Sequence, residues 1–343
     1  MKYSDAGVSI DKGNAFVERI KPLARSTFKK GVLSGIGGFA GLFEIDRKQF
    51  RHPVIVTSTD GVGTKLKIAF EMDIHDTVGI DLVAMNVNDI VVNGAQPAVF
   101  LDYIATSKIR LDIVTDIVKG IVNGCKQAEC TLIGGETAEL PGFYADNEYD
   151  LAGFVTGVVE KDRIIDGSAI RQGDVLVGIG SSGLHSNGYS LARYVLLEKK
   201  KMKLGAYIDE LGCKLGEELL KPTIIYVRVI EKLVKQRLIK AAAHITGGGI
   251  TENLPRVFPK QFRAVIETGS WDRPVVFEMI KGLGKVDDRE MIRTFNSGLG
   301  MILVVDKNMV RKVLTVVRSQ GQRAYIIGEM RRLRGGGQRV EFA

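Results

Sequence analysis

Short apolar runs that end in glycine turns recur along this chain. Residues 54–56, Val-Ile-Val, are β-branched and predict a short buried strand, and residues 57–65, TSTDGVGTK, form the turn that follows. The same order of strand, glycine turn and acid returns at residues 131–139, TLIGGETAE. Elsewhere, apolar positions recur at helical spacing, which predicts helices at residues 66–72, 77–95 and 111–125. We therefore expect an α/β (α+β) fold.

The length and the changes in polarity predict two domains. A chain of 343 residues is long enough for two domains with separate cores. The sequence turns polar around residues 160–173, and residues 174–180 begin a new strand pattern, so we place the boundary near residue 165. This divides the chain into an N-terminal domain, residues 1–165, and a C-terminal domain, residues 166–343.

The turn at residues 57–65 carries groups that suit a phosphate and a hard cation. Gly61 and Gly63 allow positive φ and a close approach of the backbone to a ligand. Asp60 could hold Mg²⁺, Thr64 offers a hydroxyl, and Lys65 could neutralise a phosphate. The structural alternative is a hairpin turn at Asp60-Gly61 with a solvated lysine. The Walker A spacing occurs nowhere, so a nucleotide site here would be of another type.

Acidic residues also follow the second strand and interrupt the predicted helix at 77–95. Asp60 and Glu136 each lie after a predicted strand, and such turns can converge on one Mg²⁺ that neutralises a triphosphate. Acids and amides within so apolar a helix are costly to bury without partners. In this helix they are Asp81, Asn86, Asn88 and Asp89. They either cap and cross-link helices or hold a cation, and the segment itself leaves both options open.

Two glycine-rich segments raise the question of a dinucleotide site. Residues 31–43, GVLSGIGGFAGLF, contain the spacing G-x-G-x-x-A, but no strand pattern precedes them. This segment is either a mobile loop that folds over phosphates or a purine ring, or a flexible linker. Residues 178–183, GIGSSG, match G-x-G-x-x-G after a strand, but a polar loop continues where the fingerprint requires a helix. The pattern therefore disfavours an NAD-dependent enzyme.

Two of the four histidines lie among small polar residues. His185 is followed by Ser186 and Asn187, a setting that favours a poised acid or base over a structural histidine. His244 precedes residues 246–249, Thr-Gly-Gly-Gly, which open a helix in an arrangement that suits an anion.

Composition and charge narrow the classes of protein. The formal net charge of +8 suits nucleic acid, an acidic membrane surface or an anionic small substrate. Residues 331–334 form a dense basic run, and such a run near the end of a chain is more often a solvated tail than a nucleic-acid arm. The three cysteines include no C-x-x-C pair, which argues against a disulfide framework and a zinc site. With no apolar leader and no run of about 18 apolar residues, we expect a cytoplasmic protein.

Nine segments, in this order, closely resemble the phosphoribosylformylglycinamidine cyclo-ligase family, also called the aminoimidazole ribonucleotide synthetases. The segments are DAGVSID at Asp5, GIGGFAGLF at Gly35, STDGVGTK at Ser58, GIDLVAMNVNDIVVNGAQP at Gly79, GGETAELPGFY at Gly134, GSSGLHSNGYSLAR at Gly180, KPTIIYV at Lys221, AHITGGGITENLPRV at Ala243 and TFNSGLGM at Thr294.

The resemblance implies a two-domain PurM-like fold and a homodimer in which N-terminal strands of both subunits form a shared barrel. It implies that ATP binds in a cleft near that interface. It also implies a reaction of purine biosynthesis, in which ATP and formylglycinamidine ribonucleotide yield aminoimidazole ribonucleotide, ADP and phosphate.

The same resemblance implies roles for individual residues. The residues that would hold Mg²⁺ are Asp60, Asp89 and Glu136. The residues that would contact ATP or lie near it are Lys21, Gly35, Gly37, Gly38, Phe39, Gly41, Gly61, Gly63, Thr64 and Lys65. The residues at the reacting centre would be His185 and Asn187, and those near the substrate would be His244, Thr246, Gly247, Gly248 and Gly249. We expect Lys65 and Mg²⁺ to stabilise the transferring phosphoryl group, and His185 to move a proton.

The chain departs from the family pattern at three positions, and other functions remain as alternatives. Gln96 stands where a glutamate is usual, Ser9 where an aspartate is usual, and Ala40 where a glycine is usual. Related enzymes phosphorylate selenide or thiamine monophosphate, but the selenide enzymes carry a reactive cysteine or selenocysteine near the N-terminus, and no cysteine precedes Cys125 here. A nucleotide-sensing or nucleic-acid-binding protein is the non-catalytic alternative.

Overall fold

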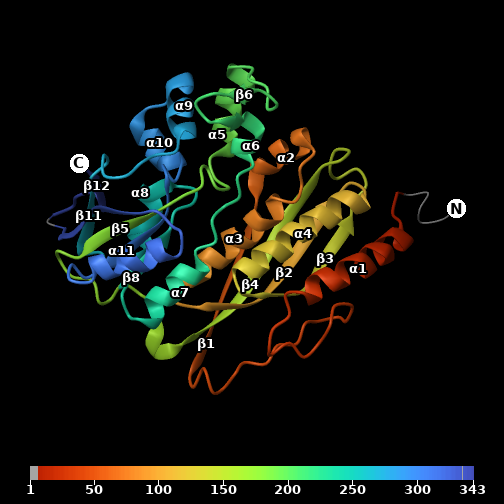
Figure 1. Cartoon of the computed structure of the whole chain (residues 1–343), viewed down its shortest axis with the longest axis horizontal. Helices are drawn as coiled ribbons and strands as arrows, with labels where there is room; N and C mark the ends of the chain where they lie inside the picture. The colour runs from red at the N-terminus through yellow and green to blue at the C-terminus, as the bar shows by residue number, and fades with distance from the viewer. Residues whose placement is uncertain (1–6, 334) are drawn as a thin grey trace. The chain divides into compact units, whose positions relative to one another are not determined.

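The computed structural model describes residues 7–333 and 335–343, and it divides the chain into two compact units (Figure 1). The N-terminal unit runs to Ile90 and resumes at Ala95–Lys161, whereas the C-terminal unit comprises Val91–Gly94 and Asp162–Ala343. The division after Lys161 lies four residues before the boundary that we placed near residue 165. None of the helices in the described ranges is long and apolar enough to cross a membrane.

The N-terminal unit is built on a four-stranded sheet in the order β1-β4-β2-β3. Its strands are β1 (Pro53–Gly61), β2 (Gln96–Thr106), β3 (Thr131–Glu139) and β4 (Tyr149–Glu160). Its helices are α1 (Ile10–Arg25), η2 (Gly63–Lys65), α2 (Leu66–Met72), α3 (Val78–Val91) and α4 (Leu111–Gln127). β4 is antiparallel to both β1 and β2, whereas β2 and β3 are parallel. The parallel pair needs a long crossover, which α4 provides.

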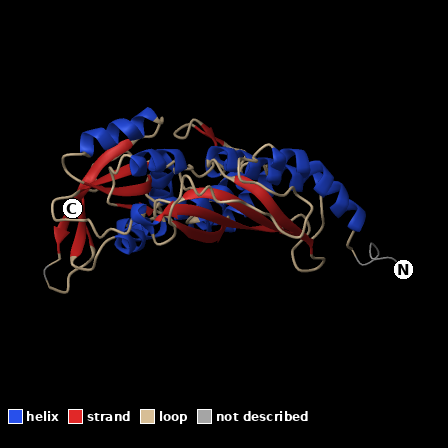
Figure 2. Cartoon of the chain, turned by 90° about the horizontal axis from the view of Figure 1, so that it is seen from below, coloured by secondary structure: helices blue, strands red, loops and turns tan. Residues whose placement is uncertain are grey.

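The two faces of this sheet have different surroundings (Figure 2). Gly153 of β4 faces α3, because a Cβ at this position would meet the side chain of Leu82 at 3.2 Å. On the opposite face, Ile55, Leu101 and Phe154 are 63%, 40% and 46% exposed. The register confirms that Leu101 and Phe154 are cross-strand neighbours. Within the N-terminal unit, the sheet therefore has one helix-covered face and one open face with apolar side chains.

Helices α3 and α4 come into backbone contact where Gly79 faces Gly120. A Cβ at Gly79 would overlap the backbone of Ile117 and Ile121 on α4. A Cβ at Gly120 would in turn overlap the carbonyl oxygen of Asp76 just before α3. Two glycines on facing helices thus allow the backbones to touch.

The C-terminal unit is built on a six-stranded sheet in the order β12-β9-β11-β5-β10-β8, with a separate two-stranded ribbon of β6 and β7. The strands are β5 (Val175–Gly180), β6 (Tyr207–Ile208), β7 (Cys213–Lys214), β8 (Ala241–His244), β9 (Phe262–Ile266), β10 (Leu299–Val305), β11 (Ala324–Arg332) and β12 (Val340–Phe342). The helices are η3 (Lys161–Arg163), α5 (Tyr189–Arg193), η4 (Tyr194–Lys199), α6 (Leu215–Leu219), α7 (Val227–Lys235), α8 (Gly249–Asn253), η5 (Leu254–Val257), α9 (Val275–Gly284), α10 (Asp288–Thr294) and α11 (Val310–Ser319).

One end of this sheet gathers three polar loops. β10 is antiparallel to both β5 and β8, and Leu299 pairs with Gly180 while Met301 pairs with His244. The start of β10 therefore lies beside the ends of β5 and β8. The loop that precedes β10 meets the loops that follow the other two strands.

Candidate functional site

The glycine turn in the N-terminal unit connects a strand to a helix. β1 continues to Gly61, and η2 then leads directly into α2, so the alternative of a hairpin turn is wrong. Gly63 has a φ of 71°, in the left-handed region that favours glycine. Asp60 Oδ1 accepts a hydrogen bond from the Gly61 N–H at 2.7 Å. Asn86 Nδ2 of α3 donates to the Asp60 carbonyl oxygen at 3.2 Å.

Lys65 points into the interior of the N-terminal unit. Its side chain is 0% exposed, and Nζ lies 2.7 Å from Oδ2 of Asp81, which is equally buried. Burial lowers the pKa of Lys65, and the Asp81 carboxylate opposes this shift. The alternative of a solvated lysine is therefore wrong, whereas the role of Lys65 at a phosphate stays a prediction.

The three predicted metal ligands do not gather at one point of the N-terminal unit. Asp60 lies on β1 and Glu136 on β3, the two edge strands, so three strand spacings of about 4.8 Å each separate them. Asp89 is nearer to β1, because its Oδ2 accepts from Ser58 Oγ at 3.4 Å. Among the described residues, no three His, Cys, Asp or Glu side chains are grouped as a metal site. Carboxylates suit Mg²⁺ chemically, and these three stay predicted ligands.

The glycine-rich segment at residues 31–43 lies on the surface of the N-terminal unit. Within it, Gly37 lies close to Lys21, and both residues were predicted to lie near ATP. A Cβ at Gly37 would lie 3.8 Å from Lys21 Nζ, and Gly37 has a φ of 113°. Lys21 also forms an ion pair with Glu18. Phe39 is fully exposed. Of the residues predicted to lie near ATP, the structure therefore brings Lys21 and Gly37 together in this segment.

Asp102 is a buried carboxylate that the sequence patterns did not single out. It lies on β2 between Gly153 of β4 and Gly135 of β3, and a Cβ at Gly135 would overlap its Oδ1. Burial raises the pKa of Asp102 to about 7, and the charge of Glu136 adds to this shift. The only feature of the sequence that could have indicated Asp102 is that it is a single acid in an otherwise apolar strand.

His185 lies in the loop between β5 and α5 and is 1% exposed. Its Nε2 accepts a hydrogen bond from the Ser182 N–H at 3.3 Å, and its φ of 60° is in the left-handed region. The ring lies beside Tyr226, whose hydroxyl donates to the Gly180 carbonyl at 2.8 Å. Gly300 makes room for both rings, since a Cβ there would overlap the Tyr226 hydroxyl. Strand ends and a glycine thus fix the His185 ring.

Asn187 joins the His185 loop to the loop after β8. Its Oδ1 accepts a hydrogen bond from the Gly247 N–H at 2.9 Å. His244, the last residue of β8, is buried at the start of the same loop. The structure therefore brings together the predicted residues of the C-terminal unit: His185, Asn187, His244, Thr246, Gly247, Gly248 and Gly249.

The glycines of this second loop are required by its shape. Gly248 has a φ of 90°, and a Cβ at Gly249 would overlap the carbonyl oxygen of Ile292. Asn253 Nδ2 donates to the carbonyl oxygens of Gly247 at 3.1 Å and Gly249 at 2.9 Å. Asn253 of α8 thus holds the loop, and Gly249 lies against α10.

Asn296 supports the His185 loop from the third loop, and sequence reasoning missed this role. Its Oδ1 accepts from Ser181 Oγ at 3.0 Å, and its Nδ2 donates to the Gly183 carbonyl at 2.9 Å. Asn296 is 1% exposed. The TFNSGLGM segment entered the sequence analysis only as one of the nine segments of the resemblance, and the partners of Asn296 lie more than 110 residues earlier in the chain.

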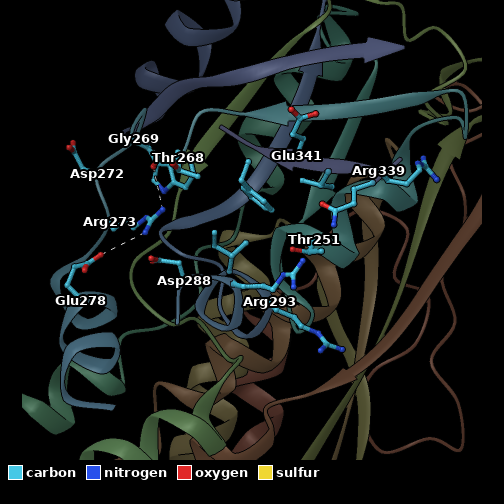
Figure 3. Close-up of a pocket in the computed structure, with 16 residues that line it drawn as sticks. Thr251, Thr268, Gly269, Asp272, Arg273, Glu278, Asp288, Arg293, Arg339 and Glu341 are labelled. Carbon is cyan, nitrogen blue, oxygen red and sulfur yellow. Dashed lines mark hydrogen bonds and ion pairs between the residues drawn. The ribbon is translucent and has the colours of Figure 1, made fainter. Parts of the chain in front are cut away.

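A cavity of about 1240 Å³ in the C-terminal unit lies outside these three loops (Figure 3). Its lining includes Trp271, and its charged side chains are Asp272, Arg273, Glu278, Asp288, Arg289, Arg293, Arg339 and Glu341. The four arginines are matched by four carboxylates, so the charge of the lining favours neither anions nor cations.

Comparison with known proteins covers both units. A family model described as AIR synthase related protein, N-terminal domain, matches residues 42–159, and its C-terminal counterpart matches residues 171–338. Among solved structures, a thiamine-monophosphate kinase from Stenotrophomonas maltophilia is 17% identical with a TM-score of 0.72, and the match covers 94% of this chain and 95% of that one. A hydrogenase maturation protein HypE in complex with ATP is 18% identical with a TM-score of 0.67, over 95% and 91% of the two chains. These structures share the fold.

Curated relatives are much closer in sequence. The phosphoribosylformylglycinamidine cyclo-ligase of Thermoanaerobacter pseudethanolicus is 56% identical over 98% of this chain and 99% of its own length. That of Desulfatibacillum aliphaticivorans is 49% identical over 100% of this chain and 99% of its own length. The chain has a two-domain α/β fold. It therefore belongs to the phosphoribosylformylglycinamidine cyclo-ligase family.

Proposed function

We propose that this protein catalyses the ATP-dependent ring closure of formylglycinamidine ribonucleotide to 5-aminoimidazole ribonucleotide, with release of ADP and phosphate. The observation that carries this proposal is the identity of 56%, over nearly the full length, to a curated relative named for the reaction. The gathering of the three polar loops around His185, Asn187 and His244 supplies the matching site in the C-terminal unit.

The chemical obstacle in this reaction is an amide oxygen that does not leave. Transfer of the terminal phosphoryl group of ATP to that oxygen forms a phosphate ester of the amide and releases ADP. The amidine nitrogen of the same substrate then attacks the activated carbon, and phosphate leaves. Because the attack is intramolecular, the substrate itself supplies part of the proximity.

His185 is the residue that we assign to proton movement during closure. Its Nε2 accepts the Ser182 N–H, so the neutral ring carries its proton on Nδ1. Nδ1 is therefore the atom that would exchange a proton with the substrate. Asn187 holds the adjacent loop through Gly247 and would orient the substrate beside that ring. The loop of Thr246, Gly247, Gly248 and Gly249, with His244 at its start, would line the site of the anionic ribonucleotide.

ATP would bind to the N-terminal unit. The fold neighbours include HypE with ATP and a ThiL protein complexed with AMPPCP and TMP, which supports nucleotide binding by this fold. In this chain Thr64, Gly61 and Gly63 would approach the phosphates from the turn after β1. From the glycine-rich loop, the contributing residues would be Lys21, Gly35, Gly37, Gly38, Phe39 and Gly41.

Mg²⁺ would neutralise the charge of the triphosphate and of the transferring phosphoryl group. Asp60 and Asp89 are the carboxylates best placed to hold one ion together, because Asp89 contacts Ser58 two residues before Asp60. Glu136 lies on the other edge strand, and we propose that it serves a separate ion.

The open face of the N-terminal sheet supports a homodimer. Ile55, Leu101 and Phe154 expose large apolar side chains on this one face, Leu101 and Phe154 as direct neighbours, and such exposed apolar groups are typical of an interaction surface. A second copy of the chain, with the same sheet, is the occupant that we propose. We propose that the protein carries out this reaction of de novo purine biosynthesis in the cytoplasm.

The test is product formation by the purified protein with Mg-ATP and formylglycinamidine ribonucleotide, each component being omitted in turn. We expect ADP and aminoimidazole ribonucleotide in equal amounts, and neither product when one component is missing. ADP without the ring product would contradict the proposal and indicate a kinase with another acceptor. Absence of both products from folded protein would also contradict it.

A further inference from the structure

The ion pair of Lys65 and Asp81 connects the glycine turn to α3. Lys65 is the last residue of η2, and Asp81 lies in the first turn of α3. The two charged atoms are 2.7 Å apart, and both side chains are completely shielded from solvent. The pair therefore ties the end of the turn to the helix.

The same helix also holds the start of the turn. Asn86, five positions after Asp81, donates from Nδ2 to the Asp60 carbonyl oxygen at 3.2 Å and to the Leu82 carbonyl oxygen at 2.8 Å. Residues 60–65 are thus fixed at both ends by polar side chains of α3. Between these two points lie Gly61, Gly63 and Thr64, the residues to which we assign contacts with phosphate.

The burial of Lys65 suits a residue that holds the turn in place better than a residue that binds phosphate. Removing an ammonium and a carboxylate from water costs several kcal/mol per ion, and the pair offsets this cost only by close contact. A lysine that meets a phosphate as a point charge keeps its ammonium at a surface open to the ligand. Lys65 instead uses its ammonium on Asp81 inside the unit.

We propose that Lys65 and Asp81 are positioning residues whose ion pair fixes residues 60–64 in the conformation that receives the ATP phosphates, and that the Lys65 ammonium does not contact those phosphates. The inference rests on the proposed use of ATP. It assigns Asp81, which carried no specific role in the sequence analysis, to the support of the nucleotide site.

The test compares three variants by calorimetric titration with a non-hydrolysable ATP analogue, by steady-state kinetics and by thermal unfolding. Lys65→Met and Asp81→Asn each remove one charge and leave the other buried. Lys65→Met/Asp81→Leu removes both charges and keeps similar shapes, a replacement that is often tolerated for buried ion pairs. We expect each single variant to raise KM for ATP about tenfold or more, with a smaller change in kcat, since coupled pairs contribute up to about two orders of magnitude. The double variant should recover most of the lost affinity.

A direct contact between Lys65 and phosphate gives a different pattern. The double variant would then bind the analogue as weakly as Lys65→Met, and Asp81→Asn, which retains the ammonium, would keep its affinity. Either result would overturn the inference. If a single variant does not fold, the folded double variant decides: recovered binding supports the inference, and lost binding rejects it.

A surface ion pair provides the matched control. Lys119 pairs with Asp116 on α4 at 2.8 Å, and its side chain is 54% exposed. Lys119→Met should leave affinity and unfolding temperature unchanged. Binding of the analogue requires no turnover, so wild-type protein that binds it without forming a ring product would reject the proposed function and leave this comparison valid.

Discussion

The side chain of Asn187 accepts a hydrogen bond from the backbone N–H of Gly247 at 2.9 Å, and this contact joins the loop of His185 to the loop of His244. The bond is exposed, so its net contribution to stability is about 1 kcal/mol or less. The main effect of this hydrogen bond is to position two loops, both of which the substrate would contact.

Asn187→Ala should therefore impair the reaction far more than the fold. We expect kcat/KM for the ribonucleotide to fall by roughly 10- to 100-fold, because positioning errors are costly in rate. Urea unfolding should show a loss of only about 1 kcal/mol. Asn308→Ala, at an exposed position of the same unit, is the control. Unchanged kcat/KM would contradict the positioning role.

Replacement of His185 should reduce turnover while preserving the backbone. His185→Asn is the informative variant, because asparagine tolerates the left-handed conformation that His185 adopts at a φ of 60°. Loss of proton transfer should lower kcat by about 10²- to 10⁴-fold. His52→Asn, on an exposed histidine, should have no effect. Nearly full turnover in His185→Asn would show that another group moves the proton.

Asp60→Asn tests the proposed metal site. An asparagine keeps the oxygen that accepts the Gly61 N–H at 2.7 Å, so the turn should retain its shape. The loss of one carboxylate should raise the Mg²⁺ concentration needed for half-maximal activity by roughly tenfold or more. Asp116→Asn on the surface of α4 is the control. An identical Mg²⁺ titration curve would rule out Asp60 as a ligand.

Asp102 should make stability depend on pH. Its pKa is raised from 3.8 to about 7, so the folded protein binds this proton more tightly than the unfolded chain does. This contribution to stability is fully present below about pH 4 and is lost as pH rises through 7. Since one pKa unit corresponds to 1.36 kcal/mol, the loss is at most about 4 kcal/mol. Urea unfolding of Asp102→Asn should therefore show the variant gaining stability relative to wild type between pH 5 and pH 8. A constant difference across that range would contradict the assignment.

Phe154→Glu tests the proposed dimer surface. A charge in the middle of the open apolar face would be buried by a second copy without a partner, so the variant should be monomeric. Tyr207→Glu changes a comparably exposed aromatic of the C-terminal unit and should leave the dimer intact. Sedimentation measures both. A monomeric wild type, or a dimeric Phe154→Glu, would contradict the proposal.

The sequence predicted local features well where strands end in glycine turns. The helix expected at residues 66–72 is α2, Leu66–Met72, and the helix expected at residues 111–125 is α4, Leu111–Gln127. The fingerprint at residues 178–183 fails for the reason expected, since α5 begins only at Tyr189. These results depend on neighbouring residues, whose periodicity and turn chemistry the sequence displays directly.

Partners far apart in the chain could not be predicted in the same way. The sequence predicted that Lys65 contacts a phosphate, with a solvated lysine as the alternative, because nothing in its own segment shows that Asp81 lies beside it on the next helix. Asn296 and its partner Gly183 are 113 residues apart, and only the pairing of β10 with β5 brings them together. The distance between Asp60 and Glu136 could not be predicted either, because the order β1-β4-β2-β3, which puts their strands at opposite edges, is not visible in the sequence.

The contact between Gly79 and Gly120 bears on how this protein tolerates mutation. These two residues have no functional groups in their side chains, yet they set how closely α3 packs on α4, and α3 supplies the Asp81 and Asn86 side chains that contact residues 60–65. One added methyl group at either position would displace the helix and, with it, both ends of the turn. We therefore expect Gly79 and Gly120, which lie between two helices, to tolerate substitution least of all residues in the N-terminal unit.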